Sequence, residues 1–389
     1  MIALIGGRVI TVTGPILKNG VVLFDERNGK IMAVGSKDEV SVPDDAEVIE
    51  VHDKVIAPGL VDAHSHIGVI PEGLDWEYSD VNDFYSPVTP HLRALDAIDP
   101  YDEGFKHALE GGVTTVYTGP GSANVIGGIG TIMKTYGASL RDMVMKGEAA
   151  LKMALGPKRP REYKSKIPYP TTRMGTVAML RSWLIRAKEL SEGKLKEDKI
   201  DPEEKLMLQV ISRVLKGELL AKIHLSTSPD EIYAIVNLIE EFGLRATIDH
   251  VFGGQLVADM LAAKRIPVVY GPPLIPRRAA YFKYISDEAP VIMYRKGVNV
   301  SIMTDHPVIP QKHLRVLAAV TVKNGLSLDE ALKLITINPA RALGIADRVG
   351  SIEPGKDADI IVAFDHPIKP RSRIDMVFVR GKLAYKADA

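Results

Sequence analysis

A long alternation of short apolar strands with helical stretches, from about residue 57 to residue 345, most constrains the fold of this chain. Runs rich in β-branched and apolar residues predict the strands. The clearest strands are residues 113–117, 221–225, 245–250, 267–270 and 298–303. The clearest helices are residues 230–242, 254–263 and 310–323. Alternation of this length predicts an α/β fold, either a parallel barrel or an open sheet.

The two ends of the chain differ from this middle region. Residues 1–56 consist of short strands and turns, with Asn28-Gly29 at a hairpin, and strand character returns after residue 346. We predict that 1–56 and 346–389 form one composite small β domain, a β-sandwich, beside a barrel domain over 57–345. A chain of 389 residues is long enough for both.

Two insertions interrupt the barrel region, at residues 67–100 and 156–218. Long loops inside a compact α/β domain usually serve as lids or binding loops. The second insertion contains a basic loop, 158–164, and a charged run from Ser191 to Glu204. We interpret the charged run as the solvated tip of a helical hairpin.

The composition excludes several kinds of chemistry. The chain has no cysteine, so any metal must be bound by His, Asp, Glu or a modified Lys. Lys plus Arg equals Asp plus Glu, 49 each, which gives no general reason to bind nucleic acid or an anionic membrane. No apolar run approaches the ~20 residues that span a bilayer. The N-terminus lacks the basic segment of a signal peptide. We therefore expect a cytoplasmic protein with a small-molecule substrate.

His64 and His66 stand two residues apart at the end of an apolar strand. Alternate residues on a strand point to the same face, so the two imidazoles can reach one point. The alternative is a pair of polar side chains at a barrel rim that bind no metal. The motif alone leaves the metal site and this alternative equally open.

Three further residues occupy matching positions. His224 and His250 each end a predicted strand, and Asp305 follows the strand 298–303. In a parallel barrel such strand ends converge on the face where active sites lie. Four imidazoles and one carboxylate there form a ligand set for zinc or a similar divalent ion.

Several motifs now resemble those of the amidohydrolase superfamily over essentially the whole chain. They are residues 57–66, Thr304-Asp305-His306-Pro307, residues 336–340, and residues 350–359. Within the superfamily the chain is most similar to the imidazolonepropionase-related branch, which includes Xaa-Pro dipeptidases. The resemblance implies a distorted (β/α)8 barrel with metal ligands His64, His66, His224, His250 and Asp305. It also implies one or two metal ions and, by analogy, a homo-oligomer.

Binuclear relatives add a bridging ligand on the fourth barrel strand, commonly a carboxylated lysine. The resemblance points to Lys152 in the run 148–155, with Lys134 as the rival. A surface or rim charge is the alternative for either lysine.

The implied reaction is hydrolysis of a C–N bond, in an amide, a cyclic amide or a dipeptide, by metal-activated hydroxide. Asp305 and His250 are the expected catalytic groups. Asp305 would accept the proton of the water and deliver it to the leaving nitrogen. Some branches carry a Glu two or three residues after the histidine that corresponds to His224, and residues 225–228 contain none. This departure disfavours a deaminase and imidazolonepropionase itself. A deaminase or lactonase on the same fold, and a non-catalytic scaffold, remain the alternatives.

Four side chains are candidate substrate contacts because they lie on loops or strand ends at the expected active face. They are Arg93, Arg173, Tyr270 and Arg277. An Arg can bind a substrate carboxylate through two hydrogen bonds. The alternative for the three arginines is a salt bridge on the surface. The alternative for Tyr270 is a place in the hydrophobic core.

Overall fold

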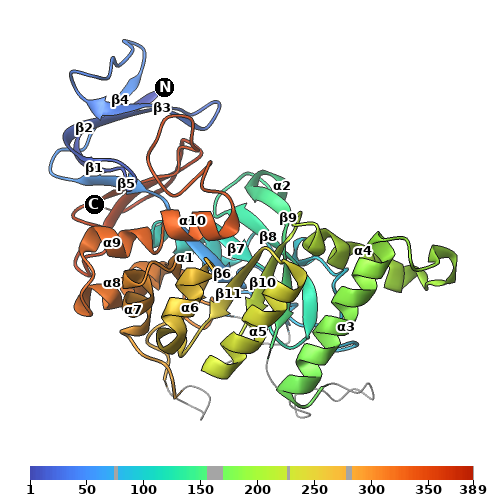
Figure 1. The fold of residues 1–389 in the computed structure, drawn as a ribbon. Coiled ribbons are helices and arrows are strands. Elements are labelled where there is room, and N and C mark those ends of the chain that lie inside the picture. Colours follow the sequence, from blue (N-terminus) through green and yellow to red (C-terminus); the bar gives the residue numbers. More distant parts are fainter. Residues whose placement is uncertain (74–77, 156–169, 226–227, 277–282, 389) are drawn as a thin grey trace.

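The computed structural model describes residues 1–73, 78–155, 170–225, 228–276 and 283–388. Its larger part is a nearly closed barrel of eight strands in the order β13-β12-β11-β10-β9-β8-β7-β6 (Figure 1). The strands are β6 (Leu60–Ser65), β7 (Val113–Thr118), β8 (Ile126–Lys134), β9 (Val144–Ala154), β10 (Leu220–His224), β11 (Ala246–His250), β12 (Val268–Tyr270) and β13 (Val300–Ile302). The fold is therefore the predicted distorted (β/α)8 barrel rather than an open sheet.

Strand β8 is the distortion, because it runs antiparallel to both of its neighbours, β7 and β9. A parallel pair needs a crossover connection of about a dozen residues or more. The connections 119–125 and 135–143 are shorter than that. As a result β8 has its C-terminal end where the parallel strands have their N-terminal ends.

Backbone hydrogen bonds between β6 and the segment after β13 close the C-terminal end of the barrel. Asp305 N donates to His64 O at 3.2 Å, and His66 N donates to His306 O at 2.9 Å. The first and last barrel strands thereby bring the predicted histidine pair next to Asp305.

The chain ends build a second sheet apart from the barrel, at the upper left of Figure 1. Its strands are β1 (Ile2–Ile10), β2 (Ile16–Asp25), β3 (Lys30–Ser36), β4 (Glu47–Glu50), β5 (Val55–Pro58), β14 (Ile360–Ala363), β15 (Ile374–Val379) and β16 (Lys382–Lys386). Three strands separate β2 from β15 in the sheet, yet the rings of Phe24 and Phe378 lie 5.2 Å apart. The sheet therefore folds over a shared apolar core, as in a sandwich. Strand β1 begins at Ile2, so the predicted short strands of residues 1–56 start almost at the first residue.

Helices cover the outside of the barrel (Figure 1). They are α1 (Glu103–Glu110), α2 (Leu140–Met143), α3 (Arg173–Ser191), α4 (Pro202–Leu215), α5 (Pro229–Phe242), α6 (Ala258–Ala263), α7 (Ala289–Arg295), α8 (Leu314–Lys323), α9 (Leu328–Lys333) and α10 (Ile337–Leu343). Helix α5 ends as predicted at Phe242, and the next residue, Gly243, adopts φ 63° and terminates the helix. Two predicted helices, 254–263 and 310–323, contain a 3-10 turn before α6 and α8.

The second insertion contains α3 and α4, which pack against each other, and the charged run joins them. The basic loop 158–164 lies outside the described residues. In the described part of the chain, no helix is both long and apolar enough to cross a membrane.

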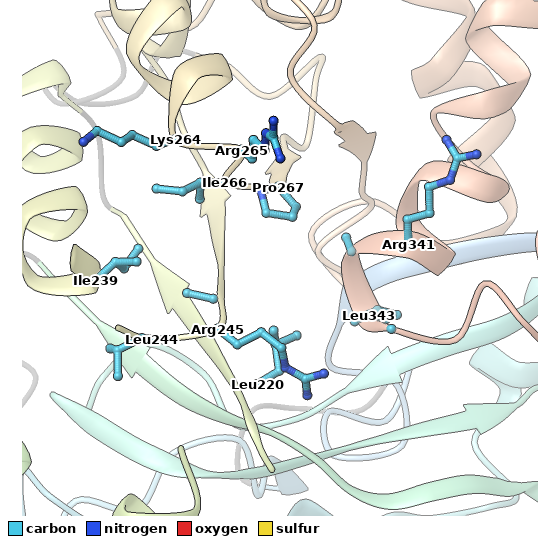
Figure 2. Close-up of a pocket in the computed structure, with 13 residues that line it drawn as sticks. Leu220, Ile239, Leu244, Arg245, Lys264, Arg265, Ile266, Pro267, Arg341 and Leu343 are labelled. Carbon is cyan, nitrogen blue, oxygen red and sulfur yellow. The ribbon is translucent and has the colours of Figure 1, made fainter. Parts of the chain in front are cut away.

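A cavity of about 300 Å³ lies at the end of the barrel where β10 and β11 begin (Figure 2). Four cationic side chains line it: Arg245, Lys264, Arg265 and Arg341. Active sites of (β/α)8 barrels lie at the opposite end, after the strands, so this cavity is not where the predicted ligands meet.

Candidate metal centre

The C-terminal ends of four barrel strands bring the predicted ligands together inside the barrel. Single ligand atoms of His64, His250 and Asp305 all lie within 4.8 Å of one another. The ring centroids of His64 and His66 are 5.3 Å apart, and those of His224 and His250 are 4.1 Å apart. The five side chains therefore form one cluster.

Backbone carbonyls anchor two of the rings. The Nδ1 atom of His66 donates to Gly119 O at 2.7 Å, and Nδ1 of His250 donates to Gly271 O at 2.8 Å. A carbonyl oxygen can only accept, so the ring proton sits on Nδ1 and leaves a lone pair on Nε2. An imidazole held in this way is ready to bind a metal through Nε2.

A carboxylate anchors the third ring. Oδ2 of Asp249 accepts from Nδ1 of His64 at 2.6 Å, and both side chains are fully buried. Burial would raise the pKa of Asp249, but Lys222 and His64 outweigh it and hold the pKa well below its usual value. Asp249 is therefore ionised and can only accept, which places the lone pair of His64 on Nε2 as well.

The electron pairs of these imidazoles and of Asp305 consequently face one another, with no ring proton between them. Oδ1 of Asp305 lies 3.2 Å from Nε2 of His64 and 3.4 Å from Nε2 of His66. Nε2 of His250 is buried and has no hydrogen-bond partner in the described structure. Burial lowers the pKa of His250 to about 3, which keeps the ring neutral. Such a set of donors suits a divalent cation.

Lys152 also belongs to this cluster. Its Nζ lies 3.3 Å from Nε2 of His64, and the residue is 1% exposed. Burial lowers the pKa of Lys152 to about 8, so part of it is the neutral amine near neutral pH. The neutral amine is the form that reacts with carbon dioxide to give a carbamate.

Lys134, the rival for this position, lies elsewhere. It is the last residue of the antiparallel strand β8 and is paired there with Thr115 of β7, near the start of that strand. Its Nζ lies 2.5 Å from Oδ2 of Asp359 and 3.1 Å from Oδ2 of Asp357. These carboxylates belong to the return of the chain towards the small sheet, so Lys134 forms part of a buried ion cluster at that junction.

Two of the arginines named as substrate contacts form ion pairs on the surface. Arg93 donates to both oxygens of Asp96, and Arg173 pairs with Asp230 at the start of α5. Both guanidinium groups are about half exposed. These pairs agree with the alternative interpretation, in which the arginines form salt bridges on the surface. Arg277 lies outside the described residues.

Tyr270 lies at the end of β12 and is buried. Its hydroxyl donates to Ser286 O at 2.7 Å, and its ring lies 5.6 Å from that of Phe252. Through these contacts Tyr270 lines the barrel interior and holds the loop that follows β12.

Sequence reasoning missed two buried charges beside the cluster, Lys222 and Asp249. The Nζ of Lys222 lies 3.0 Å from each oxygen of Asp249. A signal was available, because Lys222 stands two residues before His224 on one strand and so faces the same side. Asp249 gave no such signal, since its role depends on a partner from strand β6.

Asp62 is a third buried charge that sequence reasoning left without a role. Its Oδ2 accepts from Thr304 Oγ1 at 2.6 Å and from Gln311 Nε2 at 2.9 Å. Burial raises the pKa of Asp62 to about 6. These bonds tie strand β6 to the segment that carries Asp305.

Comparison with known proteins places this geometry in a family. The model of the amidohydrolase family matches residues 286–384. A crystal structure of an amidohydrolase from Thermotoga maritima MSB8 is 37% identical, with a TM-score of 0.92 and complete coverage of both chains. The chain therefore belongs to the amidohydrolase family.

Further relatives support the predicted branch of the superfamily. An imidazolonepropionase from Fusobacterium nucleatum is 25% identical, over 95% of this chain and 92% of that protein. A structure of a Xaa-Pro dipeptidase with bound methionine has a TM-score of 0.62 at 17% identity, covering 99% of each chain, which shows the shared fold. The imidazolonepropionase is a relative of the kind that the predicted branch contains, and the dipeptidase structure adds the shared fold alone.

One curated relative is considerably longer than this chain. The amidohydrolase tasK from Hapsidospora irregularis is 30% identical over 91% of this chain, which spans only 39% of that protein. The match therefore concerns one part of a larger protein.

Proposed function

We propose that this protein is a metal-dependent amidohydrolase that hydrolyses a C–N bond in an amide, a cyclic amide or a dipeptide. One observation carries the proposal. Nε2 of His64, Nε2 of His66 and a carboxylate oxygen of Asp305 converge without a shared proton, while each ring is anchored through Nδ1.

The ligand set that we propose holds one or two divalent ions, with zinc as the expected metal. His64, His66, His224, His250 and Asp305 supply it, and Lys152 as its carbamate supplies the bridge. A divalent ion bound there lowers the pKa of water and polarises a carbonyl group. Imidazole and carboxylate ligands without thiolates suit zinc but do not single it out.

Asp305 carries out the proton transfers in this proposal. As the water oxygen attacks the carbonyl carbon, a carboxylate oxygen of Asp305 accepts the water proton. When the C–N bond breaks, Asp305 returns that proton to the leaving nitrogen. Its Oδ1 already lies within 3.4 Å of two imidazoles, so it borders the place where the reaction would occur.

The experiment measures metal content and hydrolysis together. Purified protein is stripped with a chelator, reloaded with zinc, and assayed on Xaa-Pro dipeptides, N-acyl amino acids and cyclic amides. We expect new amine groups from at least one class with the zinc-loaded protein and none with the stripped protein. Hydrolysis that is equally fast without metal would contradict the proposal.

Two control substrates test the alternatives on the same fold. Adenine nucleosides would release ammonia with a deaminase, and simple lactones would release acid with a lactonase. We expect neither to be the best substrate, because no carboxylate follows His224 at residues 225–228. Preferential ammonia release would assign the protein to the deaminases instead.

A further inference from the structure

A continuous chain of buried contacts runs from one side of the barrel to the other. Lys222 on β10 contacts Asp249 on β11, and Asp249 contacts His64 on β6. The side chains of all three residues are 0% exposed. The sheet order places β10 and β11 at some distance from β6, so this chain crosses the barrel interior.

His64 is anchored differently from the other two rings described above. Backbone carbonyls hold His66 and His250, and their orientation is set by the main chain. The acceptor for His64 is a side-chain carboxylate, which needs partners of its own to keep its position. Lys222 provides them by binding both oxygens of Asp249 at 3.0 Å.

Lys222 itself is held firmly in place. Its ammonium group lies 4.8 Å from the centre of the Tyr117 ring, a distance at which a cation is attracted to the ring face. A buried carboxylate without a cation would be strongly unfavourable, so Asp249 and Lys222 act as one unit. Neither side chain is among the candidate ligands.

We propose that Lys222 is a positioning residue, which acts through Asp249 to keep the His64 proton on Nδ1 and present Nε2 to the metal ion. The inference rests on the ligand set of the proposed function. It adds that the buried Lys222–Asp249 pair sets the metal affinity of that ligand set.

Replacement of the carboxylate by an amide tests the proposal. In Asp249→Asn one of the two carboxylate oxygens, each 3.0 Å from the Lys222 ammonium, becomes an NH2 group. With that NH2 group at Nδ1 of His64, the ring must carry its proton on Nε2 and is a poor ligand. With the amide oxygen there, the neutral amide accepts more weakly than the carboxylate does. Loss of such outer partners typically weakens metal binding about 10–100-fold, and we expect that range for zinc, measured by competition with a chromophoric chelator.

A second replacement should restore binding. In the double variant Lys222→Met with Asp249→Asn, no ammonium competes for the amide oxygen, which can accept from Nδ1 of His64 again. We expect the double variant to bind zinc more tightly than Asp249→Asn alone. A purely structural role predicts instead that removal of the unpaired buried ammonium restores the free energy of unfolding but not the zinc affinity.

Asp359→Asn is the matched control. Asp359 is also a buried carboxylate paired with a buried barrel lysine, Lys134, and that pair contacts none of the candidate ligands in the described structure. We expect this variant to lose stability and keep the zinc affinity of the wild-type protein. Unchanged zinc affinity in Asp249→Asn, or a double variant that binds no better, would overturn the inference.

One measurement needs no variant. Nitrogen NMR of the metal-free wild-type protein reports which ring atom of His64 carries the proton. A proton on Nδ1 supports the inference, and a proton on Nε2 alone would overturn it even if Asp249→Asn fails to fold. If the wild-type protein binds no zinc, the proposed function itself fails, which is a distinct result.

Discussion

At the scale of single residues, the candidate centre combines unusual backbone geometry with buried charge. His250 and Asp305 adopt φ values of 70° and 53°, and Val251 adopts 50°. Residues other than glycine rarely occupy this region, and each costs on the order of 1–3 kcal/mol. Such conformations persist where surrounding contacts impose them, and they often mark functional sites. Here they turn two candidate ligands at strand ends towards the barrel interior.

Asp305→Asn should separate metal binding from turnover. The amide keeps an oxygen for the metal but cannot accept the proton of the attacking water. We expect zinc content near that of the wild-type protein and a fall in kcat of about 100-fold or more. Metal analysis and rate measurements on one preparation check this. Substantial remaining turnover would remove Asp305 from its proposed role.

Lys152→Met should reduce metal content. Methionine fills a similar volume but cannot form a carbamate, so the proposed bridge between two ions is lost. We expect less zinc per chain, by elemental analysis, together with reduced turnover. Lys134→Met is the control, since that lysine is also buried in a barrel strand but contacts Asp359 instead. Equal zinc content in wild-type protein and Lys152→Met would argue against the bridge.

At the scale of elements, helix α1 begins with a side chain that also holds the loop after β6. Asp102 Oδ1 accepts from Gly104 N at 2.9 Å and from Glu72 N at 2.8 Å. Its other oxygen accepts from Gly68 N at 2.9 Å. One carboxylate thus caps a helix and fixes the segment that immediately follows His66.

Asp102→Ala should therefore have two effects. Loss of the cap is expected to lower the free energy of unfolding by about 1–2 kcal/mol, and the freed loop should weaken zinc binding at His66. Ser327→Ala is the comparison, because Ser327 caps α9 in a reciprocal capping box with Glu330. It should cost similar stability in urea unfolding without changing zinc affinity. Equal zinc affinities in the two variants would disprove the link.

At the scale of the whole molecule, a buried ion cluster joins the barrel to the small sheet. Asp357 contacts Lys134 of the barrel strand β8, Lys30 of β3, and Arg348. Burial would raise the pKa of Asp357, but these three cations outweigh it and lower the pKa to about 2.

This shift predicts how stability depends on pH. A carboxyl group with a lowered pKa in the folded state stabilises the protein above its unfolded pKa, near 3.8. That contribution should be lost as the pH falls from about 4 towards 2. In Asp357→Asn the corresponding part of the acid dependence should be absent, although the variant is less stable at neutral pH. Urea unfolding between pH 5 and pH 2.5 measures the free energy of unfolding of the wild-type protein and of Asp357→Asn. If both free energies fell equally with pH, the assignment to Asp357 would be contradicted.

The sequence by itself determined which strand ends carry the candidate ligands. Strand periodicity places His64 and His66 on one face, and the convergence of parallel strand ends brings His224, His250 and Asp305 to them. Strand periodicity is a local rule, and the convergence of strand ends depends only on the fold class. A single sequence was therefore enough to predict which strand ends carry the ligands. Motifs also indicated the family, and the alternating pattern indicated the α/β architecture.

Only the tertiary structure decided which lysine joins that cluster and what anchors it. Lys134 and Lys152 are both buried on neighbouring barrel strands, and the resemblance favoured Lys152 but left Lys134 open as the rival. The direction of β8 does, because an antiparallel strand carries its last residue to the opposite end of the barrel. Asp249 likewise acquires its role only when β11 faces β6 across the interior. Strand direction and contacts across the barrel are non-local, so neither lies in the pattern of any one segment.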